Sequence, residues 1–257
     1  MKDIDALVSF ATELAELSRS IVRSHPILEV AHEIKADGTP VTRVDREVEH
    51  KLREHIDKHY PQHGILGEEF PSRDIDADRV WVIDPIDGTK HFAIGVPVYG
   101  TLIALAEAGE FVLGVMDFPA TDDRWIGGRD YPTRWNNQVV RAAQCNDLSR
   151  ATIVRSDPDR SSVDENIGLS NLADAGVFSV CGAGSYGFAM VASGKLDIAV
   201  DVGLDPFDIG APVAIIEAAG GSAADWRGQP LTLESHGRVL FLGDSALLDP
   251  AMNLLQA

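Results

Sequence analysis

The chain has 257 residues, of which 45% are hydrophobic and 24% are charged, and its formal net charge is −18 at pH 7. This length and composition exclude a disordered or fibrous protein and fit one large globular domain or two closely packed halves. The negative charge argues against nucleic acid or an anionic membrane as a partner, because a polyanion would repel the chain.

The first part of the chain is predicted to be helical. Apolar residues recur at helical spacing over residues 4–22, and a His-Pro pair at 25–26 is expected to end this helix. A second helical pattern covers residues 45–59. The preceding sequence, Thr-Arg-Val-Asp at 42–45, has the form of a helix cap.

Short β-branched and aromatic runs follow, beginning at residue 80. The runs at 98–107 and 110–118 are separated by Ala-Gly, which predicts a hairpin in an antiparallel sheet. Further elements are predicted as a strand at 124–128, strands near 151–155 and 196–201, and helices near 165–175, 186–193 and 208–219. This alternation indicates layered α and β elements, in one domain with two halves, approximately 1–146 and 147–257.

We expect a reduced, cytoplasmic protein. The two cysteines, Cys145 and Cys181, are too few and too isolated for a disulfide framework or a Cys-rich zinc site. The first ten residues include acidic residues where a secretory signal would carry positive charge, and no apolar stretch approaches transmembrane length. Neither a membrane nor a nucleic acid is therefore expected as a partner.

The segment WVIDPIDGTKHF, residues 81–92, runs a hydrophobic strand into two aspartates. Side chains three positions apart point to opposite faces of a regular strand, so Asp84 and Asp87 converge only if the strand does not continue. We expect Pro85 to end the strand and Gly88 to permit a turn that aims both carboxylates at one point. The alternative is an ordinary Asp-Pro turn without a site.

Two other segments supply carboxylates. Glu68 and Glu69 follow a short apolar run, and Asp208 starts a predicted helix, where it is either an N-cap or a site residue. These candidates offer oxygen ligands only, which suits Mg²⁺ or Mn²⁺ rather than zinc. Two such ions about 3.5–4 Å apart, sharing Asp84, would clamp the attacking and leaving oxygens of a phosphoryl transfer.

Three segments resemble, in this order, the signature motifs of the inositol monophosphatase superfamily: GEE at 67–69, WVIDPIDGTKHF at 81–92 and DPFDIGAPVAIIEAAGG at 205–221. The resemblance extends over nearly the whole chain. It implies an α/β (α+β) fold, the layered αβαβα sandwich of inositol monophosphatase and fructose-1,6-bisphosphatase. It also implies a lithium-sensitive phosphomonoesterase, usually homodimeric, that uses two or three Mg²⁺ ions, with Mn²⁺ as a substitute, on a small phosphorylated metabolite.

The resemblance also implies residue roles. The implied metal ligands are Glu68, Asp84, Asp87, Asp208 and the Ile86 carbonyl oxygen. Glu68 and Thr89 would activate the attacking water, with Asp45 hydrogen-bonded to Thr89. The amides of Gly88 and Thr89 would bind the phosphate. The expected substrate contacts are Ser185, Tyr186 and Asp201.

The motifs are most similar to the histidinol-phosphate phosphatase branch, because of Lys90 after Asp-Gly-Thr and the segments 95–128 and 225–231. CGAGSYGF at 181–188 departs from that branch, and Asp201 stands where many members have a glutamate. Histidinol phosphate is therefore the predicted substrate. Inositol-1-phosphate, or another sugar or aminocyclitol phosphate, is the alternative.

Two other functions stay open. Aspartyl-phosphate phosphatases also use Asp…Asp-Gly-Thr, but their aspartates are two apart, whereas here they are three apart with a proline between them. An inactive regulatory protein with this fold would lack metal ligands, and none is missing. The polar segment 157–165 suggests no chemistry, and His63 and His91 are expected at the surface or behind the site residues.

Overall fold

The computed structural model describes residues 2–26, 31–36 and 38–256. The helices are α1 (Lys2–Ser24), α2 (Arg43–His59), α3 (Thr89–Ile94), α4 (Val163–Ala175), α5 (Gly184–Ala192), α6 (Pro206–Ala218) and α7 (Leu248–Leu255). The strands are β1 (His32–Ile34), β2 (Pro40–Thr42), β3 (Gly64–Gly67), β4 (Arg79–Asp87), β5 (Gly100–Glu107), β6 (Glu110–Phe118), β7 (Asp123–Gly128), β8 (Tyr131–Trp135), β9 (Gln138–Val139), β10 (Thr152–Arg155), β11 (Phe178–Cys181), β12 (Ile198–Leu204), β13 (Ser222–Ala224) and β14 (Gly237–Leu242). Every predicted helix and strand is present, with ends shifted by a few residues.

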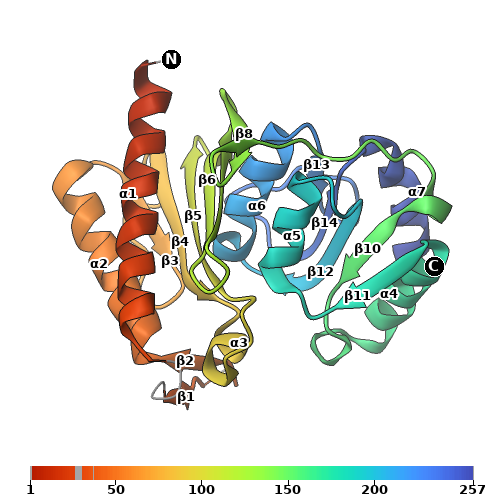
Figure 1. The fold of residues 1–257 in the computed structure, drawn as a ribbon, viewed down its shortest axis with the longest axis horizontal. Helices are drawn as coiled ribbons and strands as arrows, with labels where there is room; N and C mark the ends of the chain where they lie inside the picture. The colour runs from red at the N-terminus through yellow and green to blue at the C-terminus, as the bar shows by residue number, and fades with distance from the viewer. Residues whose placement is uncertain (1, 27–30, 37, 257) are drawn as a thin grey trace.

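The elements form five layers (Figure 1). Helices α1 and α2 cover one face of a seven-stranded sheet, α5 and α6 lie between this sheet and a five-stranded sheet, and α4 and α7 cover the far face. The predicted αβαβα sandwich is confirmed. In the part of the chain that the structure describes, no helix is both long and apolar enough to cross a membrane.

The two sheets differ in connectivity. The first has the order β3-β4-β5-β6-β7-β8-β9, with β3 parallel to β4 and the remaining pairs antiparallel, including the predicted β5–β6 hairpin. The second has the order β11-β10-β12-β14-β13, in which β10 is parallel to both its neighbours. The sequence pattern did not predict β1, β2, β8, β9, β11, β13, β14 or α7, and each of these strands has six residues or fewer.

The expectation that Pro85 ends its strand is wrong. Strand β4 continues to Asp87, but Asp84 pairs with Leu102 and Asp87 pairs with Gly100 of β5. Three steps along β4 thus face two steps along β5, so β4 carries one extra residue, a β-bulge. A bulge is a position where a proline without an N–H is tolerated inside a sheet. The extra residue reverses the alternation of side chains, which allows carboxylates three positions apart to share one side.

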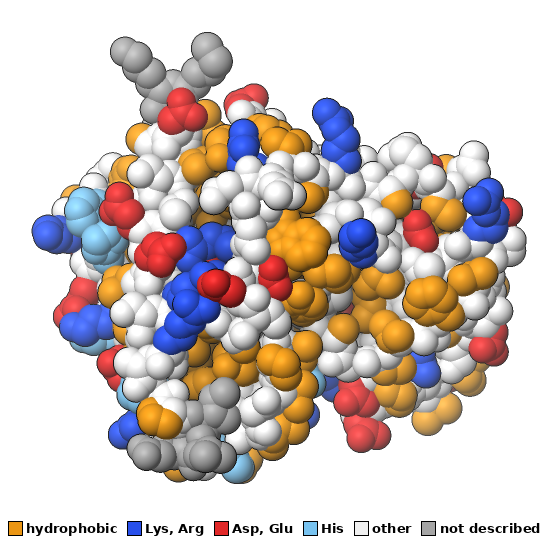
Figure 2. Space-filling model, in the orientation of Figure 1, with side chains coloured by type: hydrophobic (Ala, Val, Ile, Leu, Met, Phe, Trp, Pro, Cys, Tyr) orange, Lys and Arg blue, Asp and Glu red, His pale blue; other side chains and the backbone are white. Residues whose placement is uncertain are grey.

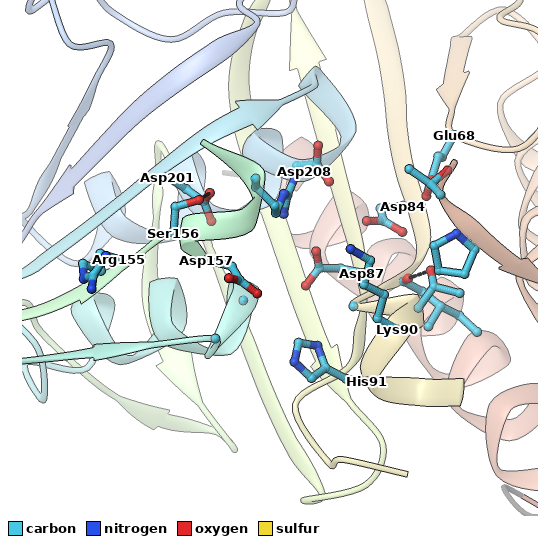
Figure 3. A pocket seen from close by; sticks show the side chains of 18 residues that line it. Glu68, Asp84, Asp87, Lys90, His91, Arg155, Ser156, Asp157, Asp201 and Asp208 are labelled. Atoms are coloured by element: carbon cyan, nitrogen blue, oxygen red, sulfur yellow. Dashed lines mark hydrogen bonds between the residues drawn. The ribbon is translucent and has the colours of Figure 1, made fainter. Parts of the chain in front are cut away.

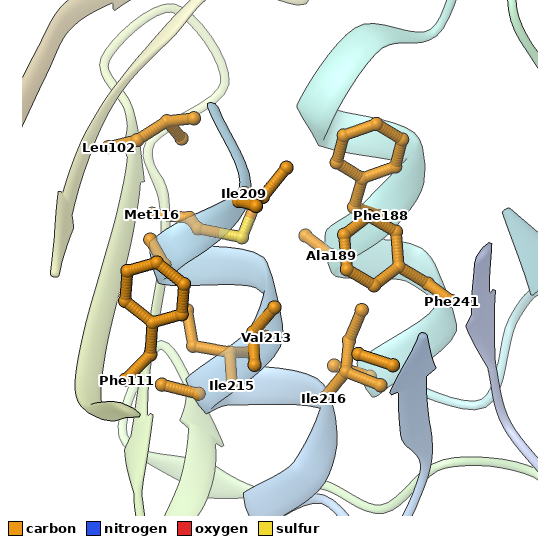
Figure 4. Packing of buried hydrophobic residues seen from close by; sticks show 14 of the residues in the cluster. Leu102, Phe111, Met116, Phe188, Ala189, Ile209, Val213, Ile215, Ile216 and Phe241 are labelled. Carbon is orange, nitrogen blue, oxygen red and sulfur yellow. The ribbon is translucent and has the colours of Figure 1, made fainter. Parts of the chain in front are cut away.

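Close packing fixes α6 against the first sheet. Gly114 of β6 faces α6 so closely that a Cβ atom there would lie 2.5 Å from the Ala211 carbonyl oxygen. Figure 4 shows the surrounding core, with Phe111 and Met116 on one side of α6 and Phe241 on the other. Because interiors packed at this density resist small shifts, the N-terminus of α6 is held at a defined distance from β4.

Candidate active site

The predicted acidic metal ligands Glu68, Asp84, Asp87 and Asp208 line one cavity, where the ends of several elements meet (Figure 3). Asp84, Asp87 and Asp208 each offer a carboxylate oxygen, and these oxygens lie within 4.8 Å of one another. Glu68 follows β3, which runs parallel to β4, and its backbone N–H donates to the Ile83 carbonyl oxygen at 3.3 Å. Carboxylates from three separate segments of the chain therefore meet in one place.

Asp208 has two structural roles at the start of α6. Asp205 is the N-cap of this helix, so the alternative expectation that Asp208 is the N-cap is wrong. Asp208 is the third helical residue, and its Oδ2 accepts a hydrogen bond from the Asp205 backbone N–H at 2.7 Å. The same carboxylate lines the cavity, so one side chain both secures the helix start and joins the acidic cluster.

Burial determines the electrostatics of this cluster. Burial raises the pKa of Glu68 and Asp87, and it raises the pKa of Asp84 and Asp208 well above the usual range, with neighbouring carboxylates adding to both. Asp84 is 2% exposed, and its Oδ1 has no hydrogen-bond partner among the described residues. Oxygen donors this close together fit a hard divalent cation, which would balance their charge and coordinate the unpartnered oxygen.

A hydroxyl group lies beside the cluster, at the start of α3. Gly88 precedes this helix with φ 78° and ψ 38°, a left-handed conformation that glycine adopts without strain. The Thr89 Oγ1 lies 3.0 Å from the Ile86 carbonyl oxygen and 3.3 Å from Oδ1 of Asp45. The other Asp45 oxygen accepts the backbone N–H of Thr42 at 2.9 Å, in the predicted cap of α2. Burial raises the pKa of Asp45, which suits a group that accepts a proton.

Comparison with known proteins shows the family to which the chain belongs. The model of the inositol monophosphatase family matches residues 3–248, which is nearly the entire chain. The chain belongs to the inositol monophosphatase family. Its fold and the order of its three acidic segments agree with the resemblance found in the sequence.

The relatives of the chain within the inositol monophosphatase family are named for different substrates. The chain is 34% identical to the bifunctional phosphatase IMPL2 of Arabidopsis thaliana, over 99% of this chain and 76% of that protein. It is 37% identical to a histidinol-phosphatase of Chlorobaculum parvum, over 80% of each. An inositol monophosphatase structure from Zymomonas mobilis is similar with a TM-score of 0.88 and 34% identity, covering 98% of both chains. The chain is thus a phosphatase of this family.

Two of the three expected substrate contacts lie behind the cavity wall. The hydroxyl and the backbone N–H of Ser185 both donate to Oδ2 of Asp87, the latter at 3.3 Å. The Tyr186 hydroxyl donates to Asp123 at 2.9 Å, on the side of the first sheet, and the tyrosine does not line the cavity. Adjacent residues of a helix point in directions about 100° apart, so Ser185 and Tyr186 of α5 do not face the same site.

The third expected contact, Asp201, does line the cavity. Its Oδ1 accepts hydrogen bonds from the Ser156 hydroxyl at 2.5 Å and from the Val202 backbone N–H at 2.8 Å. Arg155, Asp157 and Arg160 complete this wall. The segment 157–165 was expected to carry no chemistry, yet two of its charged residues, Asp157 and Arg160, line the cavity. The sequence did contain a signal for these residues. Polar residues directly follow a predicted strand here, β10, in the same way that Glu68 follows β3.

The two histidines beside the motifs, His63 and His91, lie in different environments. His91 lines the cavity, so it lies at the site itself rather than behind it. His63 is 4% exposed, and its Nδ1 accepts the indole N–H of Trp81 at 3.1 Å, which places it in the core below β4. A surface position for His63 was therefore wrong, and Trp81 supplies the polar partner that makes its burial acceptable.

We expect Lys35→Met to bind Mg²⁺ about 3- to 10-fold more tightly, because an ammonium group then no longer competes with the ion. Lys35 Nζ lies 2.9 Å from Oε1 of Glu68 and 2.5 Å from Oε1 of Glu69. Titration calorimetry at low ionic strength measures the affinity. Lys51→Met is the matched control, since Lys51 pairs with Glu54 on the surface. Equal affinities of the two variants would contradict the competition.

We expect the metal-free protein to lose stability as the pH rises above about 4. The raised pKa values of Asp84 and Asp208 mean that the folded chain binds more protons than the unfolded chain, so its stability is largest at low pH and falls as these groups ionise. Melting temperatures measured with EDTA should be lower at about pH 8 than at about pH 5.5, and Mg²⁺ should raise them more at the higher pH. An opposite order would show that the cluster is not the dominant titrating group.

Proposed function

We propose that the chain is a Mg²⁺-dependent phosphomonoesterase that hydrolyses histidinol phosphate to histidinol. The observation that carries the metal-dependent part is the cluster of Asp84, Asp87 and Asp208 within 4.8 Å, with an unpartnered, buried Asp84 oxygen. The 37% identity to the histidinol-phosphatase of Chlorobaculum parvum supports the substrate. A homodimer and a cytoplasmic location belong to the same proposal.

The proposed metal sites share Asp84. Glu68 and the Ile86 carbonyl oxygen would complete one site, and Asp87 and Asp208 would complete the other. Mg²⁺ would be the resident ion, and Mn²⁺ could replace it. A third ion could bind to the same acidic residues. Bound there, the ions would supply charge stabilisation for a transferring phosphoryl group and lower the pKa of water. Ser185 enters this proposal through its hydrogen bonds to Asp87, which hold that carboxylate in place.

The residues of the chain would then orient and deprotonate the attacking water. The Thr89 hydroxyl would donate a hydrogen bond to Asp45 and accept a hydrogen bond from the attacking water. Glu68 would take part in removing the proton of that water. The water oxygen bonds to phosphorus as the opposite bond, from phosphorus to the ester oxygen, breaks, without a phosphoenzyme. The departing alkoxide takes up a proton and leaves as the alcohol, and inorganic phosphate remains. The backbone amides of Gly88 and Thr89, at the turn into α3, would bind the phosphate oxygens.

The wall opposite the acidic cluster would select the organic part of the substrate. Asp201 is held by Ser156, so its carboxylate has a fixed direction at the cavity surface. A carboxylate here would accept a hydrogen bond from the ammonium group or the imidazole N–H of histidinol phosphate. An inositol, sugar or aminocyclitol phosphate offers hydroxyl donors instead, and the similarity to the Zymomonas mobilis inositol monophosphatase makes this the second candidate class.

Phosphate release tests the proposal. Histidinol phosphate, inositol-1-phosphate and a set of sugar and aminocyclitol phosphates are compared by kcat/KM with Mg²⁺, with Mn²⁺, with added Li⁺ and with EDTA. We expect activity that depends on the metal and is at least about tenfold higher on histidinol phosphate, a difference of about 1.4 kcal/mol in transition-state binding. A preference below tenfold would refute the substrate, no turnover of any ester would favour an inactive binding protein, and a trapped phosphoaspartate would favour the rival mechanism.

A further inference from the structure

The edge of the second sheet beside the acidic cluster has the geometry of a ligand site. Strands β10 and β12 are parallel neighbours, so their carboxyl ends lie side by side. The chain leaves β10 for α4, on the far face of the sheet, and leaves β12 for α6, on the near face. Where the connections of two parallel neighbours diverge in this way, a crevice opens between them. The site cavity reaches this β10–β12 crevice, where Arg155, Asp157, Arg160 and Asp201 line it. In Figure 3, Arg155, Asp157 and Asp201 lie on the side of the cavity away from Glu68.

Arg155 is a cation without a partner. Basic side chains on the face shown in Figure 2 mostly lie beside acidic ones. Arg155 is half-buried, its Nε is fully buried, and its guanidinium makes no hydrogen bond or ion pair with the residues that the structure describes. Such a group costs free energy, because part of its hydration is lost without a replacement. A ligand that brings an anionic acceptor into the crevice would offset this cost.

Arg160 is the second cation of the crevice. It ends a short turn, η3 (Pro158–Arg160), and the side-chain amide of Asn166 in α4 donates to the carbonyl oxygen of the first residue of this turn at 3.0 Å. Nη2 of Arg160 donates to the Gly203 carbonyl oxygen at 3.3 Å, after the end of the crevice formed by β12. Burial raises the pKa of Asp201, and the nearby Arg160 guanidinium opposes this rise. The turn thus holds a positive charge close to Asp201, although no ion pair joins Arg160 to a described carboxylate.

The charges of the crevice balance. Arg155 and Arg160 bring two positive charges, and Asp157 and Asp201 bring two negative ones. Asp201 also has a fixed direction, because its Oδ1 accepts the Ser156 hydroxyl. Such a wall is complementary to a group that itself carries both signs, with each charge facing its opposite. A second phosphate group would bring about two negative charges and no positive one, and would face the two carboxylates without compensation.

We propose that the β10–β12 crevice binds an organic part that carries both an ammonium and a carboxylate, so that phosphorylated hydroxy-amino acids are a further substrate class. The ammonium would contact Asp201, and the carboxylate would contact Arg155 and Arg160. This inference rests on the proposed function, since the same metal site would hydrolyse the ester. The water oxygen bonds to phosphorus, the bond from phosphorus to the ester oxygen breaks, and one proton of the water ends on the departing oxygen. The products are the free hydroxy-amino acid and inorganic phosphate. Histidinol phosphate would use only the carboxylate side of this wall.

Two esters that differ by one carboxylate test the proposal. O-phospho-L-serine and O-phosphoethanolamine carry the same phosphate and ammonium groups. With Mg²⁺, we expect kcat/KM of the wild type to be at least about tenfold higher for O-phospho-L-serine, because only this ester reaches the guanidinium groups. Both esters are measured on one preparation, so the ratio does not depend on the fraction of folded protein. A ratio below about tenfold would overturn the proposal.

Arg155→Met removes the charge and keeps much of the apolar length of the side chain. This variant should lower the ratio of the two kcat/KM values by at least about tenfold, through slower turnover of O-phospho-L-serine alone. Arg227→Met is the matched control. Arg227 is exposed and lines a neighbouring hollow together with Arg160, but it does not line the site cavity. The control should keep the wild-type ratio, and an unchanged ratio in Arg155→Met would overturn the proposal.

The outcomes separate this proposal from the proposed function. Turnover of histidinol phosphate without turnover of O-phospho-L-serine would overturn the zwitterion site alone. The reverse result would support the zwitterion site and refute histidinol phosphate as the substrate. If no ester is hydrolysed, the proposed function fails, and titration calorimetry with Mg²⁺ compares the Kd values of the same two esters. At least about tenfold tighter binding of O-phospho-L-serine would then support the site, and any smaller difference would overturn it.

Discussion

Asp84→Asn is expected to lower kcat for phosphate release by about 10³-fold or more at saturating Mg²⁺. Asparagine keeps the shape of the side chain, but it removes the negative charge and one anionic oxygen at the centre of the cluster. Burial and neighbouring carboxylates raise the pKa of Asp84 well above the usual range, so a bound cation would favour its ionised form. Initial rates measure the loss of kcat, and titration calorimetry measures the loss of Mg²⁺ affinity.

The same substitution should stabilise the metal-free protein, because it removes a buried charge that repels Glu68, Asp87 and Asp208. Asp117→Asn is the contrasting control. Asp117 is also fully buried, but it pairs with Arg19 at 2.7 Å and with Arg124 at 2.5 Å. Its loss should cost about 3 kcal/mol of unfolding free energy and leave the rate per folded molecule unchanged. Wild-type turnover by Asp84→Asn would refute the site.

Thr89→Ala is expected to lower kcat by about 10²-fold, with metal affinity unchanged. The Thr89 hydroxyl belongs to a residue that lines the cavity and lies 3.3 Å from Oδ1 of Asp45, so it links the cavity to that carboxylate. The substitution deletes a proton path but no proposed metal ligand. Comparison of single-turnover rates with calorimetric Mg²⁺ affinities separates the two effects.

Thr89→Ser is the control for this prediction, since serine retains the hydroxyl and should keep most of the activity. A serine variant as slow as the alanine variant would show that the threonine methyl group matters rather than the hydroxyl. Unchanged kcat in Thr89→Ala would remove this residue from the mechanism. Loss of Mg²⁺ binding in either variant would show that the hydroxyl supports the metal ligands instead.

Local patterns in the sequence were sufficient to predict the layered fold and the members of the acidic cluster. Helical spacing located α1 and α2, the Ala-Gly turn located the β5–β6 hairpin, and acids that follow apolar runs located Glu68 and Asp84. These features depend on neighbours within a few residues. The placement of Asp84 and Asp87 on one side of β4 does not depend on such local neighbours. It depends on the bulge at Pro85, which is defined by pairing with β5, about 15 residues away in sequence.

The second wall of the cavity was beyond local reasoning for a similar reason. Asp157 and Arg160 follow the short strand β10, and their place beside Asp201 depends on the parallel pairing of β10 with β12. Tyr186 does not line the cavity, because its direction depends on the rotation of α5 and on its hydrogen bond to Asp123. Long-range register, rather than residue type, decided each of these positions.

The position of Asp208 in α6 has a consequence for how the protein is made. Glu68, Asp84 and Asp87 leave the ribosome well before Asp208, and α6 reaches its place only after packing against β6. A nascent chain that stops short of α6 thus holds an incomplete acidic cluster. Under the proposed metal binding, the ligand set would be completed only late in synthesis, once α6 has packed against the first sheet.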